Sequence, residues 1–359
     1  MREGVIRSIS NVFSLNPEEA NVFLDVMSVD TKVFPSPTYM EDILKKLPPP
    51  KYHIDTSTPP EENELNINVN NISTGQGEYG YVQPNRSRQY IYKFISNPIT
   101  PGTGNIMIRS ILNEPLINII LQRDPVVKNS ICRLYKLFCE KDNRGYTLIY
   151  KLEELGPTVY TLDNFFLLPR DVEINKRILL KTYGPIYKNL KHLRKTYSFE
   201  HGDLHSKNIL FVKKPYRKDG TINEDRLDTK LIDFGLSGLV LDGKLYGGID
   251  QFPTSIKQEV RHFFITFLPE DFKTQIKEIE AKYPGKGEQG VKRYLAIEDF
   301  VIQEYEKLIK PIVPNVPVPN APSAKPTLLN APMSVANLDK LIGGKTLKRR
   351  SKKRSTRKK

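Results

Sequence analysis

The hydrophobic pattern changes once along the chain, and this change limits the possible folds more than any other feature. From Leu65 onward, apolar and polar residues alternate in short runs such as LNINVNNI and QYIYKFI, which is the period of a half-buried strand. In the second half, apolar residues recur every three or four positions, most clearly over residues 179–197, which is the period of an amphipathic helix. This order predicts an α+β fold in which a β-rich lobe precedes an α-rich lobe.

Prolines and polar linkers divide the chain further. Asn16-Pro17-Glu18-Glu19 is typical of a helix start with a capping glutamate. Residues 311–332 contain seven prolines in 22 positions, which indicates a stiff, extended linker. We therefore expect an N-terminal helical extension with its linker, a β-rich lobe, an α-rich lobe, a proline-rich linker and a basic tail, at residues 1–64, 65–152, 153–310, 311–333 and 334–359.

The composition excludes several classes of protein. With 38% hydrophobic residues the chain can bury a core, so a wholly disordered protein is excluded. No apolar run is long enough for a membrane-spanning helix, and the first residues lack the apolar stretch of a secretory signal. The two cysteines, Cys132 and Cys139, support neither a disulfide scaffold nor a cysteine-based zinc site. We expect an intracellular protein, in the cytoplasm or nucleus, without membrane contact.

The net charge of +14 belongs to the tail. Residues 345–359 hold ten Lys or Arg and no acid, so the other 344 residues carry 45 bases against 41 acids. A uniformly basic nucleic-acid-binding domain is therefore not supported. We expect the tail to make non-specific nucleic-acid contacts or to direct nuclear import, with a merely solvated tail as the alternative.

A glycine-rich run lies between two predicted strands and consists of Gly75, Gln76, Gly77, Glu78, Tyr79, Gly80, Tyr81 and Val82. Glycines at this spacing let backbone N–H groups approach phosphates, although a plain glycine-rich hairpin turn has the same pattern. A dinucleotide-binding turn is excluded because Pro84 prevents a helix directly after the glycines. That turn also needs an acid about 20 residues further on, and none occurs between Glu78 and Glu114.

Lys93 lies in the next alternating run, thirteen residues after Gly80. This order of loop, strand and lysine resembles the arrangement in protein kinases, which implies that Lys93 contacts the phosphates of ATP and that a carboxylate on the following helix holds it. Glu114 is the only acid between Lys93 and Asp124. Pro115 follows it directly, so we expect Glu114 to lie at a helix break.

The strongest motif is EHGDLHSKNIL, residues 200–210. Phosphoryl transfer to a hydroxyl needs a carboxylate that orients the acceptor, and it needs oxygen ligands for Mg²⁺. Asp203 and Asn208, five residues apart, supply both from one loop. A further aspartate, Asp233, ends the short apolar strand KLI and is followed by Phe-Gly.

Together these motifs resemble those of the protein-kinase superfamily over about residues 66–310, and the chain is identified as a divergent member of the eukaryotic Ser/Thr type. The resemblance implies a bilobal fold with ATP between the lobes, Lys93 and the glycine-rich run on the phosphates, Asp203 as catalytic base, and Asn208 and Asp233 on Mg²⁺. It also makes Tyr150 the gatekeeper and places the adenine-binding hinge at Lys151, Leu152 and Glu153. Richness in Ile, Asn and Lys without Trp resembles kinases of large DNA viruses, which adds the virion or host cell as a location.

The chain departs from the family pattern in its catalytic loop. Gly202 replaces the usual arginine, and His205 replaces the lysine two residues after the aspartate, so we assign a catalytic lysine to Lys207. The loop HGDLHSKNIL is close to that of aminoglycoside- and choline-type small-molecule kinases. We expect an ATP- and Mg²⁺-dependent kinase of Ser or Thr on a protein substrate, with a small-molecule phosphotransferase as first alternative and a pseudokinase scaffold as second.

Overall fold

The computed structural model describes most of the first 310 residues. The described ranges are 1–29, 37–52, 64–65, 75–77, 80–84, 90–95, 105–143, 145–155, 161–162, 171–212, 215–219, 221–247, 269–285 and 287–310. Met1–Lys310 forms one compact unit and Pro311–Lys359 the other, and the predicted proline-rich linker and basic tail lie outside the described residues. Within the described part no helix is both long and apolar enough to cross a membrane.

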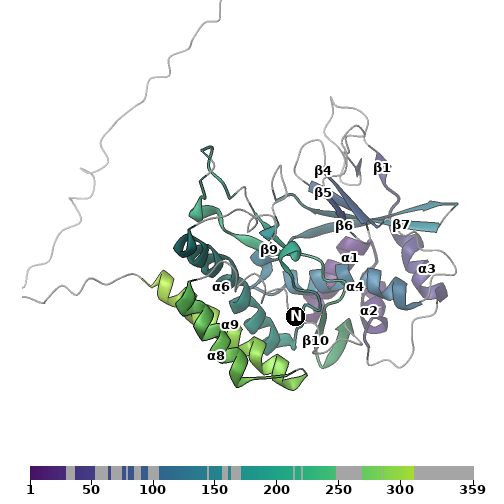
Figure 1. Cartoon of the computed structure of the whole chain (residues 1–359). Helices are drawn as coiled ribbons and strands as arrows, with labels where there is room; N and C mark the ends of the chain where they lie inside the picture. The colour runs from purple at the N-terminus through teal and green to yellow at the C-terminus, as the bar shows by residue number, and fades with distance from the viewer. Residues whose placement is uncertain are drawn as a thin grey trace, which may run out of the picture. The chain divides into compact units, whose positions relative to one another are not determined.

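The β-rich segment forms one five-stranded antiparallel sheet (Figure 1). Its strand order is β3-β4-β5-β7-β6, with β3 at Gly75–Gly77, β4 at Gly80–Pro84, β5 at Tyr90–Ile95, β7 at Gly145–Glu153 and β6 at Leu134–Asp142. A smaller parallel pair joins β1 (Lys51–Tyr52) to β2 (Glu64–Leu65). The alternating run 90–95 and the hairpin around residue 143 are therefore confirmed as strands, whereas most of LNINVNNI lies outside the described residues.

Helix α4 (Asn105–Gln122) lies against this sheet (Figure 1). The prediction of a helix break at Glu114 is wrong, since α4 continues through Pro115 for almost two further turns. Packing overrides the local effect of the proline, because α4 buries one apolar side chain after another on several sides: Leu112, Leu116, Ile117, Ile119, Ile120 and Leu121.

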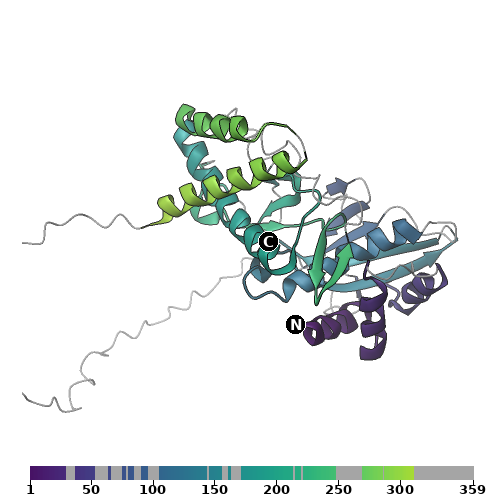
Figure 2. The ribbon, with the colours of Figure 1, turned by 90° about the horizontal axis from the view of Figure 1, so that it is seen from below.

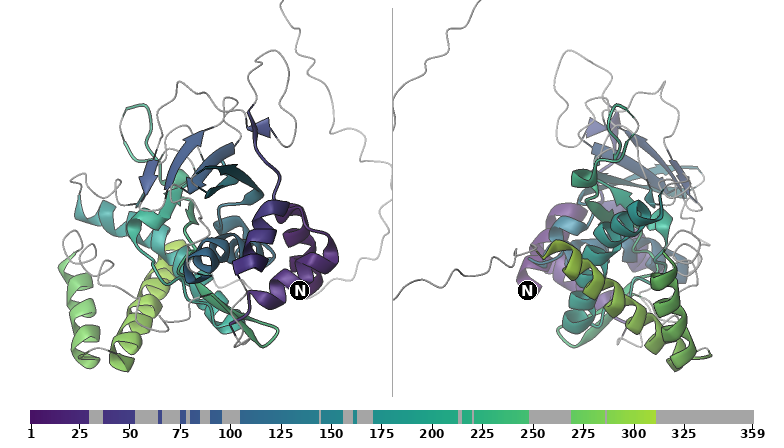
Figure 3. Two further views of the ribbon diagram at one scale, coloured as in Figure 1. Left: turned by 90° about the vertical axis from the view of Figure 1, so that its right-hand side faces the viewer. Right: turned by 60° about the vertical axis from the view of Figure 1, so that its left-hand side comes forward.

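The N-terminal extension contains three helices, α1 (Arg2–Phe13), α2 (Pro17–Val26) and α3 (Pro37–Lys46), and it lies beside α4 (Figure 3). The predicted capping box is confirmed, with the Asn16 side chain accepting from the Glu19 N–H at 2.8 Å. The Arg123 side chain at the end of α4 donates to the Gly4 carbonyl at 3.0 Å, and the Val29 N–H donates to the Leu245 carbonyl at 2.7 Å. The N-terminal extension is therefore part of the compact unit Met1–Lys310.

The second half is mainly helical. Helix α6 (Val172–Tyr197) packs against α9 (Glu288–Ile309), and α8 (Glu270–Lys282) packs on α9 (Figure 2). Gly184 on α6 lets Tyr305 on α9 approach closely, because a Cβ at residue 184 would lie 2.3 Å from the Tyr305 ring. The described residues of this half also form two strand pairs: β8 (Ile209–Phe211) with β9 (Thr229–Leu231), and β10 (Gly238–Leu241) with β11 (Lys244–Gly247). The structure confirms a mixed α+β fold, and its division into two lobes stays a prediction.

Candidate active site

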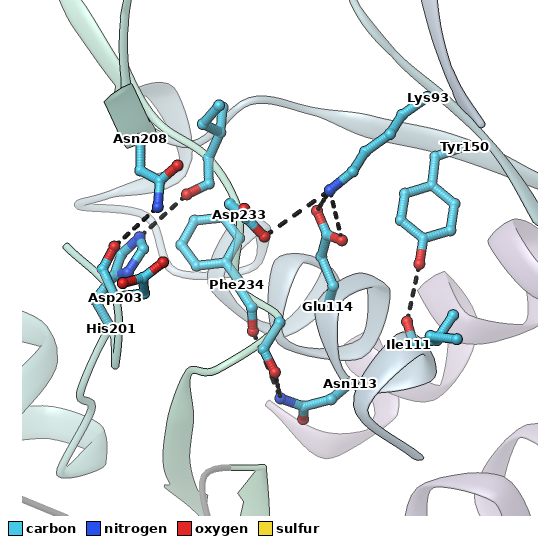
Figure 4. Close-up of polar contacts among 12 residues, drawn as sticks. Lys93, Ile111, Asn113, Glu114, Tyr150, His201, Asp203, Asn208, Asp233 and Phe234 are labelled. Carbon is cyan, nitrogen blue, oxygen red and sulfur yellow. Dashed lines mark hydrogen bonds and ion pairs between the residues drawn. The ribbon is translucent and has the colours of Figure 1, made fainter. Parts of the chain in front are cut away.

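Lys93 and Glu114 form a shielded ion pair. Lys93 projects from β5, and its Nζ lies 2.8 Å from both carboxylate oxygens of Glu114 on α4 (Figure 4). The two side chains are 20% and 15% exposed, so water screens the pair only weakly. Burial alone lowers the pKa of Lys93, but the charges of Glu114 and Asp233 outweigh it and hold the pKa above its ordinary value. Lys93 therefore stays an ammonium group.

Asp233 is a second carboxylate close to Lys93. It follows β9 with a φ of 63°, a left-handed backbone conformation that is uncommon for a residue other than glycine. Its Oδ1 lies 3.9 Å from Lys93 Nζ, and its side chain is 45% exposed. Strain of this kind persists only where the surroundings impose it, and it is concentrated at functional sites.

The loop from Glu200 to Asn208 brings Asp203 and Asn208 next to Asp233 (Figure 4). Asn208 Nδ2 donates to the Asp203 carbonyl at 2.8 Å, and the Asn208 carbonyl accepts from the Ile232 N–H at 3.1 Å. The first bond uses the side-chain amide nitrogen and the second uses the backbone carbonyl, so the side-chain oxygen of Asn208 is its candidate ligand atom. Amide and carboxylate oxygens are the kind of ligand that Mg²⁺ takes, and Mg²⁺ keeps several waters and uses few protein ligands. Binding of Mg²⁺ by Asn208 and Asp233 stays a prediction.

His201 connects this loop to Ile232, the residue directly before Asp233. The imidazole is 3% exposed, lies between the rings of Phe199 and Phe234, and donates from Nε2 to the Ile232 carbonyl at 3.1 Å. Burial lowers the pKa of His201 to about 4, so the ring is neutral at pH 7.

The backbone conformation at residue 202, and the close approach of Leu236, require a glycine. Its φ is +80°, and a Cβ there would lie 2.1 Å from the Leu236 carbonyl oxygen. An arginine at this position, as in the family pattern, would need a different path for residues 235–237.

A buried side-chain amide on α4, that of Asn113, binds the backbone of the residues after Asp233. Asn113 is 3% exposed, and its Nδ2 donates to the Gly235 carbonyl at 3.2 Å and to the Ser237 carbonyl at 3.0 Å. Sequence reasoning missed Asn113, because a single asparagine within an apolar helix pattern does not identify partners 122 and 124 residues away.

The structure places His205, rather than Lys207, beside Asp203. His205 Nε2 lies 3.5 Å from Asp203 Oδ2, and its Nδ1 accepts from the Lys207 N–H at 3.2 Å, whereas Lys207 itself is exposed. The catalytic role of Lys207 stays a prediction. The sequence signal for His205 is its position two residues after Asp203, where the protein kinases that the motif resembles usually carry a lysine.

The glycine-rich run has a strand on each side of Glu78 and Tyr79, as the sequence predicts. Gly77 pairs with Gly80 at the end of the β3–β4 hairpin, and Val82 pairs with Lys93 on the neighbouring strand. Glu78 and Tyr79 lie outside the described residues. The glycine-rich run therefore joins β3 to β4, and β4 pairs with β5, the strand that carries Lys93.

The predicted hinge residues lie at the end of β7. Lys151 is buried, with its ammonium 4.3 Å from the Tyr90 ring centroid. The Glu153 N–H donates to the Arg133 carbonyl at 2.8 Å, and the Glu153 carboxylate pairs with Lys230. Because the Glu153 amide is already used within the protein, adenine binding by Lys151, Leu152 and Glu153 stays a prediction.

Comparison with known proteins places the chain in no family. No family model matches it, and no curated protein matches it. Among solved structures it is similar to the autoinhibited serine kinase domain of the giant muscle protein titin, with 20% identity and a TM-score of 0.32. The match covers 46% of this chain and 44% of the titin chain, so it spans less than half of either protein. At this level of similarity the functional conclusion depends on the geometry of the site alone.

Proposed function

We propose that the protein is an ATP- and Mg²⁺-dependent kinase that phosphorylates Ser or Thr hydroxyls of proteins. One observation carries the proposal: a shielded Lys93–Glu114 pair lies 3.9 Å from Asp233, beside a loop that presents Asp203 and Asn208. These groups come from separate segments of the chain, and together they supply a cation for phosphates, oxygen ligands for a metal and a carboxylate for an acceptor.

Each side chain has one role in this proposal. Lys93, kept charged and directed by Glu114, binds phosphate oxygens of ATP. Asn208 and Asp233 hold Mg²⁺, which when bound neutralises charge on the phosphates. Asp203 orients the acceptor hydroxyl and accepts its proton, while neutral His201 keeps the loop in place without adding charge. Catalysis of this kind comes from positioning and electrostatics.

The acceptor class has a second candidate. The contact of His205 with Asp203 replaces the usual lysine and fits the HGDLH loop of small-molecule kinases, so a small alcohol is the alternative acceptor. A pseudokinase scaffold is disfavoured, since the sequence contains Lys93, Asp203, Asn208 and Asp233 and the Lys93–Glu114 pair is formed.

To test the proposal, purified protein is incubated with Mg²⁺ and γ-labelled ATP in two parallel reactions, one with mixed protein acceptors and one with a panel of small alcohols. Lys93→Met serves as the inactive reference. Label on Ser or Thr of proteins supports the proposal, label on alcohols alone replaces it by the small-molecule alternative, and no label above Lys93→Met on any acceptor refutes both.

The basic tail adds a separate proposal, carried by its sequence. Residues 345–359 would bind nucleic acid without base specificity, and contact with about six phosphates would give a log K versus log salt slope near −5 on duplex DNA. Deleting residues 345–359 tests this, because an unchanged DNA affinity at two salt concentrations would refute it.

A further inference from the structure

Glu114 is followed by a proline in the interior of its helix. Pro115 has no N–H to donate to the Ile111 carbonyl one turn earlier, and its ring pushes that carbonyl away from the helix axis. The residue that must meet Lys93 thus lies where α4 is locally weakened. A group that satisfies the Ile111 carbonyl would stabilise the turn that carries Glu114.

Tyr150 supplies that group. Its hydroxyl donates to the Ile111 carbonyl at 2.8 Å, and its side chain is 1% exposed, so no water replaces the bond (Figure 4). Burial, with the charges of Glu114 and Asp233, holds the pKa of Tyr150 well above its ordinary value. The hydroxyl is therefore protonated at neutral pH and can donate this bond.

The same side chain also lies next to Lys93. Tyr150 on β7 is the register partner of Lys93 on β5, and the Lys93 ammonium lies 5.8 Å from the Tyr150 ring centroid. Tyr150 therefore links the strand of the lysine to the helix of its carboxylate partner.

We propose that Tyr150 is a positioning residue whose hydroxyl replaces the amide that Pro115 lacks, and that it thereby holds Glu114 against Lys93. The inference rests on the proposed function, since it concerns the same site. It makes Tyr150 and Pro115 a matched pair: the tyrosine hydroxyl is needed only because residue 115 is a proline.

The test is a double-mutant cycle on the full chain with Tyr150→Phe, Pro115→Ala and the double variant. Tyr150→Phe removes one oxygen atom, and we expect kcat to fall about tenfold and Tm by about 2–4 °C, since a buried carbonyl loses its partner. Pro115→Ala restores a backbone N–H for the Ile111 carbonyl. In that background the same Tyr150→Phe change should alter kcat less than twofold and leave Tm unchanged.

Two further variants separate positioning from packing. Tyr187→Phe is the control, because it removes a hydroxyl that is equally buried and has no hydrogen-bond partner among the described residues, and it should leave kcat unchanged. In a Glu114→Gln background, Tyr150→Phe should alter kcat less than twofold, since the hydroxyl acts through the Glu114 carboxylate.

The outcomes are distinct. Wild-type kcat in Tyr150→Phe, or a loss that Pro115→Ala does not rescue, overturns the inference and leaves the proposed function standing. If the wild-type protein transfers no phosphate, the proposed function fails, and Tm decides the inference alone. Equal Tm losses with proline and with alanine at position 115 would then overturn it.

Discussion

Ser237 donates a 2.7 Å hydrogen bond from its hydroxyl to the carbonyl oxygen of His201, and its side chain is fully buried. Ser237 is also the only Ser or Thr between Gly235 and Phe252, the stretch that follows Asp233. A phosphate of −1.5 to −2 charge cannot be accommodated there, and Gly202 offers no arginine to pair with it. We therefore expect full activity without phosphorylation at this site.

Phosphatase-treated enzyme should transfer phosphate at the untreated rate, measured with ATP and the preferred acceptor. Ser237→Ala should keep kcat within about threefold of wild type, at some cost in stability from the lost bond. Recovery of activity only after re-phosphorylation of Ser237 would contradict this account.

The Lys93–Glu114 pair should matter for rate more than for stability. Glu114→Gln removes the charge that directs Lys93, and we expect kcat to fall by about 10- to 100-fold. The matched control is Glu298→Gln, which disrupts another buried pair, in which Glu298 accepts from Arg194 at 2.8 and 2.9 Å. This control should lower the free energy of unfolding while kcat stays near wild type. Equal effects of both substitutions on kcat would mean that the Lys93–Glu114 pair only holds the fold.

Gly202 and Gly243 distinguish a backbone clash from simple backbone strain. Both have positive φ, +80° and +76°, but a Cβ on Gly202 would lie 2.1 Å from the Leu236 carbonyl oxygen, whereas no described atom lies within 4 Å of one on Gly243. Gly243→Ala should cost about 1–2 kcal/mol in unfolding free energy, the cost of a left-handed alanine. Gly202→Ala should cost clearly more and abolish transfer, as measured by urea unfolding and by rate. Equal costs would show that residues 235–237 can move away from the catalytic loop.

His201 should make the protein less stable in acid. Its pKa in the folded protein is about 4, below the ordinary value of 6.5, because burial disfavours the imidazolium. Between these values the unfolded chain binds a proton that the folded chain does not, so stability falls as pH drops from 6.5 toward 4, by at most about 1.4 kcal/mol per pH unit. His201→Gln keeps an N–H donor but cannot titrate, so its urea midpoint should change less over this window. If the urea midpoints of the wild-type protein and of His201→Gln fell equally over this pH window, His201 would not be the source of the acid sensitivity.

Local signals in the sequence predicted much of the fold. The alternating run 90–95, the hairpin around residue 143 and the Asn16 capping box depend on residues close together in the chain, and each is present. We did not predict the β10–β11 hairpin, although Asp242-Gly243 between two short apolar runs is a two-residue turn signal that could have indicated it.

The contacts that hold the site together could not be predicted in the same way. Pro115 predicted a helix break because only its own helix was considered, whereas the hydroxyl that satisfies Ile111 comes from Tyr150, 39 residues further along the chain. Likewise, Gly202 is explained by the backbone of Leu236, whose approach no local pattern encodes. The motifs predicted which groups carry the chemistry, and tertiary contacts decide how these groups are held.

The most direct measurement of the central claim is the rate of labelled phosphate transfer by Asp203→Asn beside its affinity for the nucleotide. The asparagine keeps the size of the side chain but cannot accept the acceptor's proton, so transfer should fall by about 10²- to 10⁴-fold while nucleotide affinity stays within about threefold of wild type. Transfer by Asp203→Asn at the wild-type rate would contradict the assignment of the catalytic loop.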